Sequence, residues 1–157
     1  MRRKGHRNVQ HDEPPRGLRR ILFGGLALLG IVWAAPLTLI GGLFAAPILL
    51  CRGRGSLSGE LTPALIVTGP LGDYLLKRHP FGVMSAMAIG HIVIVDRQCL
   101  TRQILTHELT HVRQAALWGS LFPFAYVASS LWAGLRGRDA YWHNVFEIAA
   151  RKAEQHS

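Results

Sequence analysis

The chain has 157 residues, of which 49% are hydrophobic, and a formal net charge of +9. This length allows one small domain plus a membrane segment, and the hydrophobic content is unlike that of an ordinary soluble enzyme. Seven of the eighteen basic residues lie in the first twenty, and the remainder has no basic stripe with interleaved aromatics, which argues against a nucleic-acid-binding protein.

Residues 1–20 are predicted to form a disordered basic tail, because they combine high charge with two prolines and few apolar side chains. Since this tail directly precedes an apolar segment, its expected partner is anionic membrane lipid, not nucleic acid. Positive charge before a membrane segment also predicts a cytoplasmic N-terminus. We therefore expect a protein of the cell membrane, specifically the bacterial inner membrane.

Residues 21–50 contain no charged side chain and are predicted to be the transmembrane segment. As one straight helix they would be about 45 Å long, against a hydrocarbon core of about 30 Å. Two arrangements remain: a tilted span kinked near Pro36, or a re-entrant hairpin that turns within residues 36–42. A buried core helix is a further alternative, which the small size of the chain disfavours. A cleaved signal peptide is another, but apolar sequence that continues to Leu50 favours a retained anchor.

Short apolar runs after the anchor predict a small β-sheet. Ala64–Thr68 is predicted to be one strand, and Gly82–Asp96 to contain one or two more. Gly90 interrupts the second run and predicts a bulge or a tight turn.

His107-Glu108-Leu109-Thr110-His111 matches the H-E-x-x-H pattern of zinc hydrolases. Helical spacing, with Thr101 as the N-cap and no Gly or Pro before Gly119, predicts a helix here. Residues four apart share one helix face, so His107 and His111 can bind one Zn²⁺. Glu108 is the predicted catalytic residue, which would take a proton from the attacking water and return it to the leaving amine.

A catalytic zinc site needs a third protein ligand. A metzincin would have glycine at 114 and histidine at 117, where this chain has Gln114 and Leu117. The remaining choice is between two downstream glutamates. Glu147 is the predicted ligand, because it borders the apolar face of a helix predicted over residues 141–154, which would pack on the core through Val145, Ile148, Ala149 and Ala153. The alternative for Glu147 is an i, i+4 surface pair with Arg151. Glu154, near the C-terminus, is expected to be solvated.

Several other residues are candidate ligands. Cys99 is a chemically reasonable alternative, but it is expected in the turn before the zinc helix. His91 and His143 are expected to have structural or surface roles, and Asn144 could assist the site. Two cysteines without C-x-x-C spacing are too few for a disulfide framework.

The last third of the chain resembles a known kind of zinc core. It is similar to the zinc core of membrane gluzincins, including CAAX-type prenyl-protein proteases and beta-lactam-sensing receptor proteases. The resemblance lies in H-E-L-T-H, the apolar helical stretch that follows it, and then Glu147–Arg151. Those families place the third ligand in E-x-x-A-D, whereas this chain has Arg151 at the acidic position, which leaves one histidine without the family's acidic partner. A family of small bacterial membrane proteins is also similar, over Ala88–His91, His107–Gln114 and Asp139–Glu147.

The resemblance implies that a strand beside the zinc helix binds extended substrate by edge pairing, and His91–Val95 is the expected strand. Residues 119–133 form a second apolar stretch. It is too short to span a bilayer but suits a helix that lies at, or dips into, the membrane surface. The zinc site would then be close to the membrane.

The predicted fold is α+β: an N-terminal membrane helix or re-entrant hairpin, a small sheet, then zincin-like helices. The predicted divisions are the tail at 1–20, the transmembrane segment at 21–50 and a metallopeptidase domain at 55–157. The predicted function is a membrane-anchored metallopeptidase that hydrolyses a peptide or protein substrate with Zn²⁺ bound by His107, His111 and Glu147. The alternatives are a non-catalytic membrane protein with a structural zinc site and a lipid-surface scaffold without metal.

Overall fold

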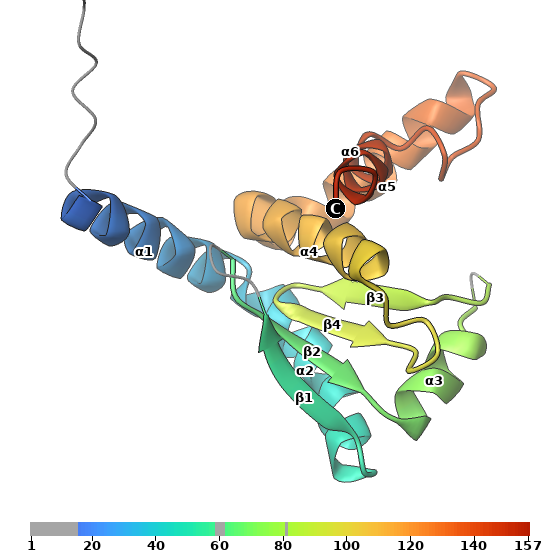
Figure 1. Ribbon diagram of the computed structural model, residues 1–157. Coiled ribbons are helices and arrows are strands. Elements are labelled where there is room, and N and C mark those ends of the chain that lie inside the picture. The colour runs from blue at the N-terminus through green and yellow to red at the C-terminus, as the bar shows by residue number, and fades with distance from the viewer. Residues whose placement is uncertain (1–15, 59–61, 81) are drawn as a thin grey trace, which may run out of the picture.

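The computed structural model describes residues 16–58, 62–80 and 82–157, without the side chains of residues 16–23, and has the predicted α+β architecture (Figure 1). Residues 1–15 of the predicted tail lie outside the described residues. The elements follow in the order α1 (Arg16–Trp33), α2 (Ala35–Leu50), β1 (Arg54–Ser58), β2 (Ala64–Thr68), α3 (Pro70–Lys77), β3 (Ala86–Ile89), β4 (Ile92–Val95), α4 (Arg102–Trp118), the 3₁₀ helix η1 (Gly119–Leu121), α5 (Phe122–Leu135) and α6 (Val145–Glu154).

Helices α1 and α2 are one apolar segment with a bend of 70° at Ala34. Pro36 cannot donate to the carbonyl of Val32, so a continuous helix would lose a hydrogen bond there, whereas the first turn of a new helix accommodates proline. Within the described residues, no single helix has the length and hydropathy of a span. The bent pair together does, as a broken span or a re-entrant loop, and α2 stays helical through Gly42.

Four strands form a mixed sheet in the order β1-β2-β4-β3. The β1–β2 and β3–β4 pairs are antiparallel, and β2 and β4 are parallel. Gly90 makes the turn between β3 and β4 with φ +60, and a Cβ there would lie 2.4 Å from the backbone nitrogen of Thr38, so only glycine fits. The strands predicted over Ala64–Thr68 and within Gly82–Asp96 are confirmed, whereas β1 and α3 were not predicted.

Strand β4 lies in the interior of the sheet and not at the edge where it is expected from the sequence. Strand β4 lies between β2 and β3, and all four of its residues are buried. The prediction that His91–Val95 pairs with substrate at a sheet edge is therefore wrong, because both of its edges are occupied. The edge strand beside α4 is β3. An unbroken run of Ile and Val is typical of a strand that is covered on both faces.

Each face of the sheet has its own hydrophobic core, because successive side chains on a strand point to opposite faces. Ile92 and Ile94 belong to the core on the α2 side, and Val93 and Val95 to the core on the α4 side. Figure 1 shows the sheet as a layer with α2 on one face and α4 on the other. The zinc-motif helix is thus fixed on a rigid platform.

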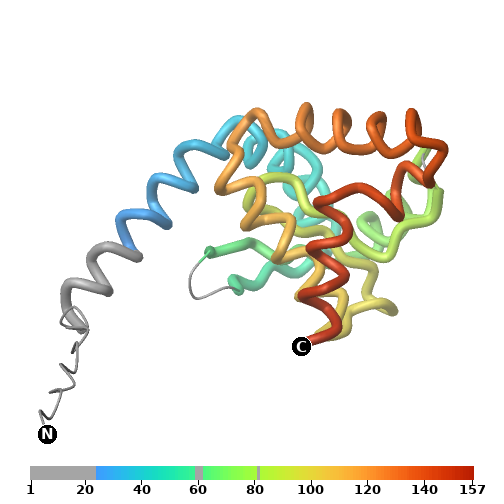
Figure 2. The backbone as a smooth tube through the Cα atoms, turned by 90° about the horizontal axis from the view of Figure 1, so that it is seen from above, coloured from blue at the N-terminus to red at the C-terminus, as the bar shows by residue number. Residues whose placement is uncertain are grey.

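The C-terminal helices are arranged around α4. Helix α5 leaves the end of α4 through η1, and the chain returns so that α6 packs beside α4 (Figure 2). Gly119 turns the chain with φ +58, and a Cβ there would lie 2.4 Å from the indole nitrogen of Trp33. The start of η1 is therefore packed against the bend between α1 and α2.

Candidate metal centre

Helix α4 carries the H-E-x-x-H residues as predicted. Its N-cap is Thr101, whose hydroxyl accepts a hydrogen bond from the backbone N–H of Ile104 at 3.2 Å. The four-residue spacing places the rings of His107 and His111 together, with their centroids 4.9 Å apart. Both rings face α6.

Helix α6 brings Glu147 to the same point, and Asn144 fixes where this helix begins. The Asn144 side chain is fully buried, and its Oδ1 accepts a hydrogen bond from the backbone N–H of Phe146 at 2.9 Å. Its Nδ2 donates to the backbone carbonyl of Tyr126 at 3.0 Å and to the Ser130 hydroxyl at 2.8 Å. Asn144 therefore caps α6 and ties it to α5, so it serves the site as a positioning residue.

His107, His111 and Glu147 form a compact group whose ligand atoms all lie within 4.8 Å of one another. The Glu147 carboxylate oxygens lie 3.4 Å from His107 Nε2 and 3.2 Å from His111 Nε2. Glu147 is 3% exposed, and its Oε2 has no hydrogen-bond partner, although a guanidinium nitrogen of Arg151 lies 3.7 Å from it as an i, i+4 ion pair. A buried carboxylate oxygen without a donor is costly unless a cation completes its surroundings.

Hydrogen bonds on the far side of each ring determine which nitrogen faces this centre. Gln114 donates its amide N–H to the carbonyl of Phe146 at 3.0 Å, so its Oε1 must accept from His111 Nδ1 at 2.8 Å. His107 Nδ1 lies 3.4 Å from the Glu154 carboxylate, which accepts when ionised. With the proton of each neutral ring on Nδ1, both Nε2 atoms carry a lone pair toward the centre.

These two lone pairs face each other across 3.2 Å, with the Glu147 carboxylate beside them. Such an arrangement is repulsive unless a cation or protons lie between the atoms. Two imidazole nitrogens and one carboxylate oxygen are a donor set that transition metals accept. The three residues therefore fit a metal ion.

The pKa shifts of the three residues also indicate that the group favours positive charge. Burial alone would lower the pKa of His107 and His111, but hydrogen bonding to Glu147 and the charges of Glu108 and Glu147 outweigh it and raise both pKa values. Burial would raise the pKa of Glu147, but hydrogen bonds with the two histidines outweigh it and hold that pKa well below its usual range. The site therefore attracts positive charge strongly.

Glu108 lies next to the group on α4 and is 7% exposed. Its carboxylate accepts a hydrogen bond from the backbone N–H of Ala88 in the edge strand β3. Burial raises the pKa of Glu108, and the neighbouring histidines oppose that shift only in part. A buried carboxyl with a raised pKa is suited to accepting and returning a proton.

The inward face of α6 differs from the predicted one. The helix begins at Val145, so residues 141–144 are a turn and not its first helical turn. Val145 and Ile148, predicted to face the core, are 59% and 47% exposed, and Glu147 and Ala150 are buried instead. The cap and the polar centre orient this helix, and these contacts outweigh the burial of two aliphatic side chains.

Glu154 is only partly exposed to solvent, whereas the sequence predicts a solvated side chain. It follows Glu147 by seven residues, which is two helical turns, and therefore shares its face. Its carboxylate is 33% exposed and contacts His107. An acidic side chain therefore lies beside His107, although position 151 holds arginine. Arg151 instead donates to the carbonyl of Trp142 at 2.6 Å.

Two tyrosines at the site were missed in the sequence. The Tyr126 hydroxyl donates to Glu147 Oε1 at 2.9 Å, and burial, with the charge of Glu147, raises its pKa. Burial and the same charge raise the pKa of Tyr141 to about 12. A signal for Tyr126 was available, because it places a phenol hydroxyl within the largely apolar stretch of residues 119–133.

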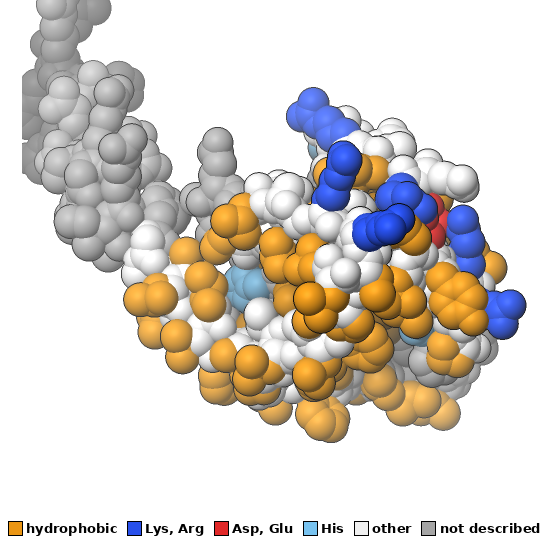
Figure 3. Space-filling model, turned by 90° about the horizontal axis from the view of Figure 1, so that it is seen from below, with side chains coloured by type: hydrophobic (Ala, Val, Ile, Leu, Met, Phe, Trp, Pro, Cys, Tyr) orange, Lys and Arg blue, Asp and Glu red, His pale blue; other side chains and the backbone are white. Residues whose placement is uncertain are grey.

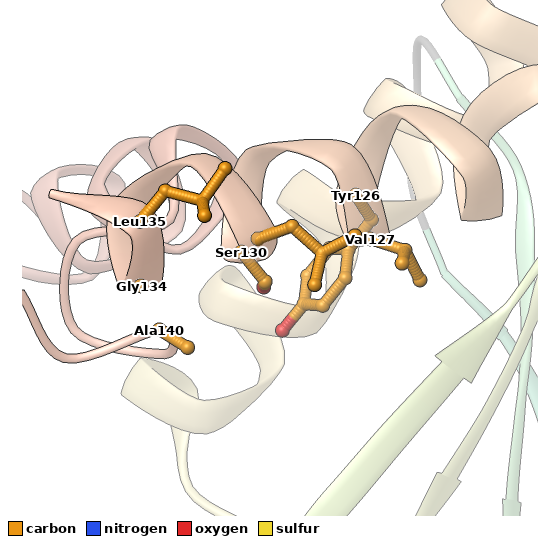
Figure 4. Close-up of a pocket in the computed structure, with 7 residues that line it drawn as sticks. Tyr126, Val127, Ser130, Gly134, Leu135 and Ala140 are labelled. Carbon is orange, nitrogen blue, oxygen red and sulfur yellow. The ribbon is translucent and has the colours of Figure 1, made fainter.

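Tyr126 also joins the metal group to a pocket on α5 with a volume of about 370 Å³ (Figure 4). The figure shows the Tyr126 ring beside the side chains of Val127 and Ser130. The pocket is lined by Tyr126, Val127, Ser130, Leu131, Gly134, Leu135 and Ala140.

The other weighed residues lie outside the metal group. His91 is buried and its Nδ1 contacts the carbonyl of Pro63 at 2.6 Å, which is the structural role expected for it. His143 is exposed in the turn before α6. Cys99 is in the loop before α4.

Comparisons of the chain with protein-family models, with curated proteins and with solved structures gave no match. The resemblance to membrane gluzincins therefore rests on the motif residues alone. What the structure shows is a buried His-His-Glu group that fits a metal ion.

Proposed function

We propose that this protein is a zinc-dependent metallopeptidase held at the membrane by its N-terminal helix pair. The observation that carries the proposal is the convergence of His107 Nε2, His111 Nε2 and the Glu147 carboxylate beside the buried Glu108. Catalytic zinc sites use this set of three protein ligands. When bound, zinc supplies a Lewis acid that polarises the scissile carbonyl and acidifies a water molecule.

The residues of the chain would perform the proton transfers. Glu108 would accept the proton that the attacking water loses and return it to the leaving amine, so that one water is consumed for each peptide bond broken. The edge strand β3 runs beside α4, and an extended peptide would pair along it. The raised pKa of Glu108 favours the protonated form that the second transfer requires.

Elemental analysis of detergent-purified protein tests the metal. We expect about one zinc per chain in the wild type and none in His111→Ala or Glu147→Ala. His143→Ala is the matched control and should keep its zinc, since His143 lies outside the metal group. Wild-type protein that lacks zinc after purification without chelator would refute the proposal.

Turnover is tested separately with Glu108→Gln. This variant should retain zinc and lose hydrolysis of every peptide that the wild type cleaves, because the amide cannot accept the proton. Unchanged hydrolysis would show that Glu108 is not the general base. Stoichiometric zinc without turnover on any peptide would instead assign the centre a structural role.

A further inference from the structure

Helix α2 has two apolar faces, and the inner one excludes a simple membrane span. Leu37, Gly41, Ala45 and Ile48 are buried along the whole length of the helix, against the sheet and α3. A helix that covers a sheet from end to end is not surrounded by lipid. The opposite face is also apolar, with 44–86% exposure at Leu39, Ile40, Leu43, Phe44 and Leu50.

Helix α5 has a comparable exposed face. Residues 114–135 contain no charged side chain. The helix has 14 residues, which gives it a length of about 21 Å, too short for a hydrocarbon core of about 30 Å. Its side chains are nevertheless 54–82% exposed at Phe124, Val127, Leu131, Trp132 and Leu135. Water is an unfavourable surrounding for so large an apolar area.

The two exposed faces lie on the same side of the molecule. Figure 2 shows α2 and α5 along one edge, and η1 packs on the bend between α1 and α2 at Trp33. That edge is the lower one in Figure 3, where hydrophobic side chains predominate, while the Lys and Arg side chains visible in that view gather toward the upper right. In this view, hydrophobic side chains therefore form a continuous apolar area along the edge that carries α2 and α5.

We propose that the outer faces of α2 and α5 form one docking surface for a single leaflet of an anionic lipid bilayer, with both helices in the membrane plane. The ends of the helices fit that position. Arg52 and Arg54 follow α2, and Arg136, which follows α5, lies 4.3 Å over the ring of Trp132. Tryptophan and arginine at the ends of apolar segments are suited to the headgroup region.

The charge distribution favours lipid over a second copy of the chain as the occupant. The net charge is +9, and arginines follow the ends of both helices. Two such surfaces placed face to face would bring like charges together, whereas anionic headgroups would neutralise them. The proposal for this surface does not depend on whether the metal group catalyses hydrolysis, because its evidence comes from α2 and α5 alone.

Site-directed fluorescence in proteoliposomes tests this surface with the full-length chain. Cys51 and Cys99 are replaced by serine, and a single cysteine carrying an environment-sensitive dye is introduced in Leu43→Cys on α2 or Leu131→Cys on α5. Leu57→Cys on β1 is the control, because Leu57 is 81% exposed and both views of the backbone place β1 away from α5. Vesicles contain phosphatidylethanolamine and phosphatidylglycerol with a fraction of brominated lipid.

The expected result is that brominated lipid quenches the dyes at positions 43 and 131 strongly while aqueous iodide does not, and that position 57 shows the reverse. Quenching of positions 43 and 131 by iodide to the level of position 57 would overturn the proposal. Protection of both positions from both quenchers would also overturn it, because it would assign the surface to a second copy of the chain. Circular dichroism of each labelled variant checks that the fold is retained.

Discussion

His107 and His111 owe their orientation to two side chains on the far side of their rings. Gln114 lies between His111 and the backbone of α6, and Glu154 contacts His107 from the last turn of that helix. Partners of this kind fix the tautomer of a ligand histidine and increase its basicity. The acidic partner that Arg151 does not provide is therefore present one turn later.

This assignment predicts the effect of Glu154→Gln. We expect zinc affinity to fall by about 10-fold, because the neutral amide oxygen is a weaker acceptor for the His107 Nδ1 proton than the carboxylate and adds no negative charge beside the ring. Competition against a chromophoric chelator measures the affinity. Gln155→Ala is the control, since Gln155 is exposed, and should bind zinc like the wild type. Equal affinities in the two variants, with unchanged circular dichroism, would show that Glu154 does not orient His107.

Helix α6 depends on Asn144 more than on its own aliphatic side chains. Replacement by alanine leaves the Phe146 N–H uncapped and removes the two hydrogen bonds to α5. For Asn144→Ala we expect a loss of about 2–4 kcal/mol in the free energy of unfolding, measured by chemical denaturation in detergent. Ser129→Ala removes only an acceptor from an exposed bond to Val145 and should cost much less. Similar losses would contradict the role given to Asn144.

Two adjacent glycines test how α2 lies on the sheet. A Cβ at Gly41 would meet the carbonyl oxygen of Ile89 at 2.6 Å, whereas one at Gly42 would meet only the Ile92 side chain, at 3.9 Å. We expect Gly41→Ala to destabilise the protein by about 1–3 kcal/mol, as overpacking does. Gly42→Ala should be neutral or slightly stabilising, because alanine favours helix. Equal effects in thermal unfolding would mean that α2 does not pack as described.

Prediction from sequence succeeded where local periodicity determines the structure. The spacing of the motif residues and the cap at Thr101 predicted helix α4 correctly, and the apolar runs predicted strands β2 and β4. The rotation of α6 was not, because it is set by contacts of Asn144 with α5, a helix more than ten residues earlier in the chain. Glu154 was missed for the same reason. Strand β1 was missed because Arg-Gly-Ser-Leu-Ser has no alternating apolar pattern.

At the scale of the whole molecule, metal binding should be coupled to stability. A ligand that binds only the folded state at one hundred times its Kd stabilises that state by about 2.7 kcal/mol. We therefore expect chelation to lower the unfolding midpoint of the wild type and to leave that of His111→Ala unchanged. Scanning calorimetry in detergent, with and without chelator, measures the difference. An equal response in the two proteins would place the bound metal elsewhere.

The polar inward face of α6 has a consequence for how the folded protein opens. The buried side chains of this helix are Glu147 and Ala150, and Glu147 faces His107 and His111, so a cation bound by these three residues would strengthen the contact between α6 and α4. The C-terminal helix should therefore be the first segment to exchange its amide hydrogens when zinc is scarce, ahead of α4 and the sheet. A shortage of zinc would then make the C-terminal end of the chain susceptible to proteolysis.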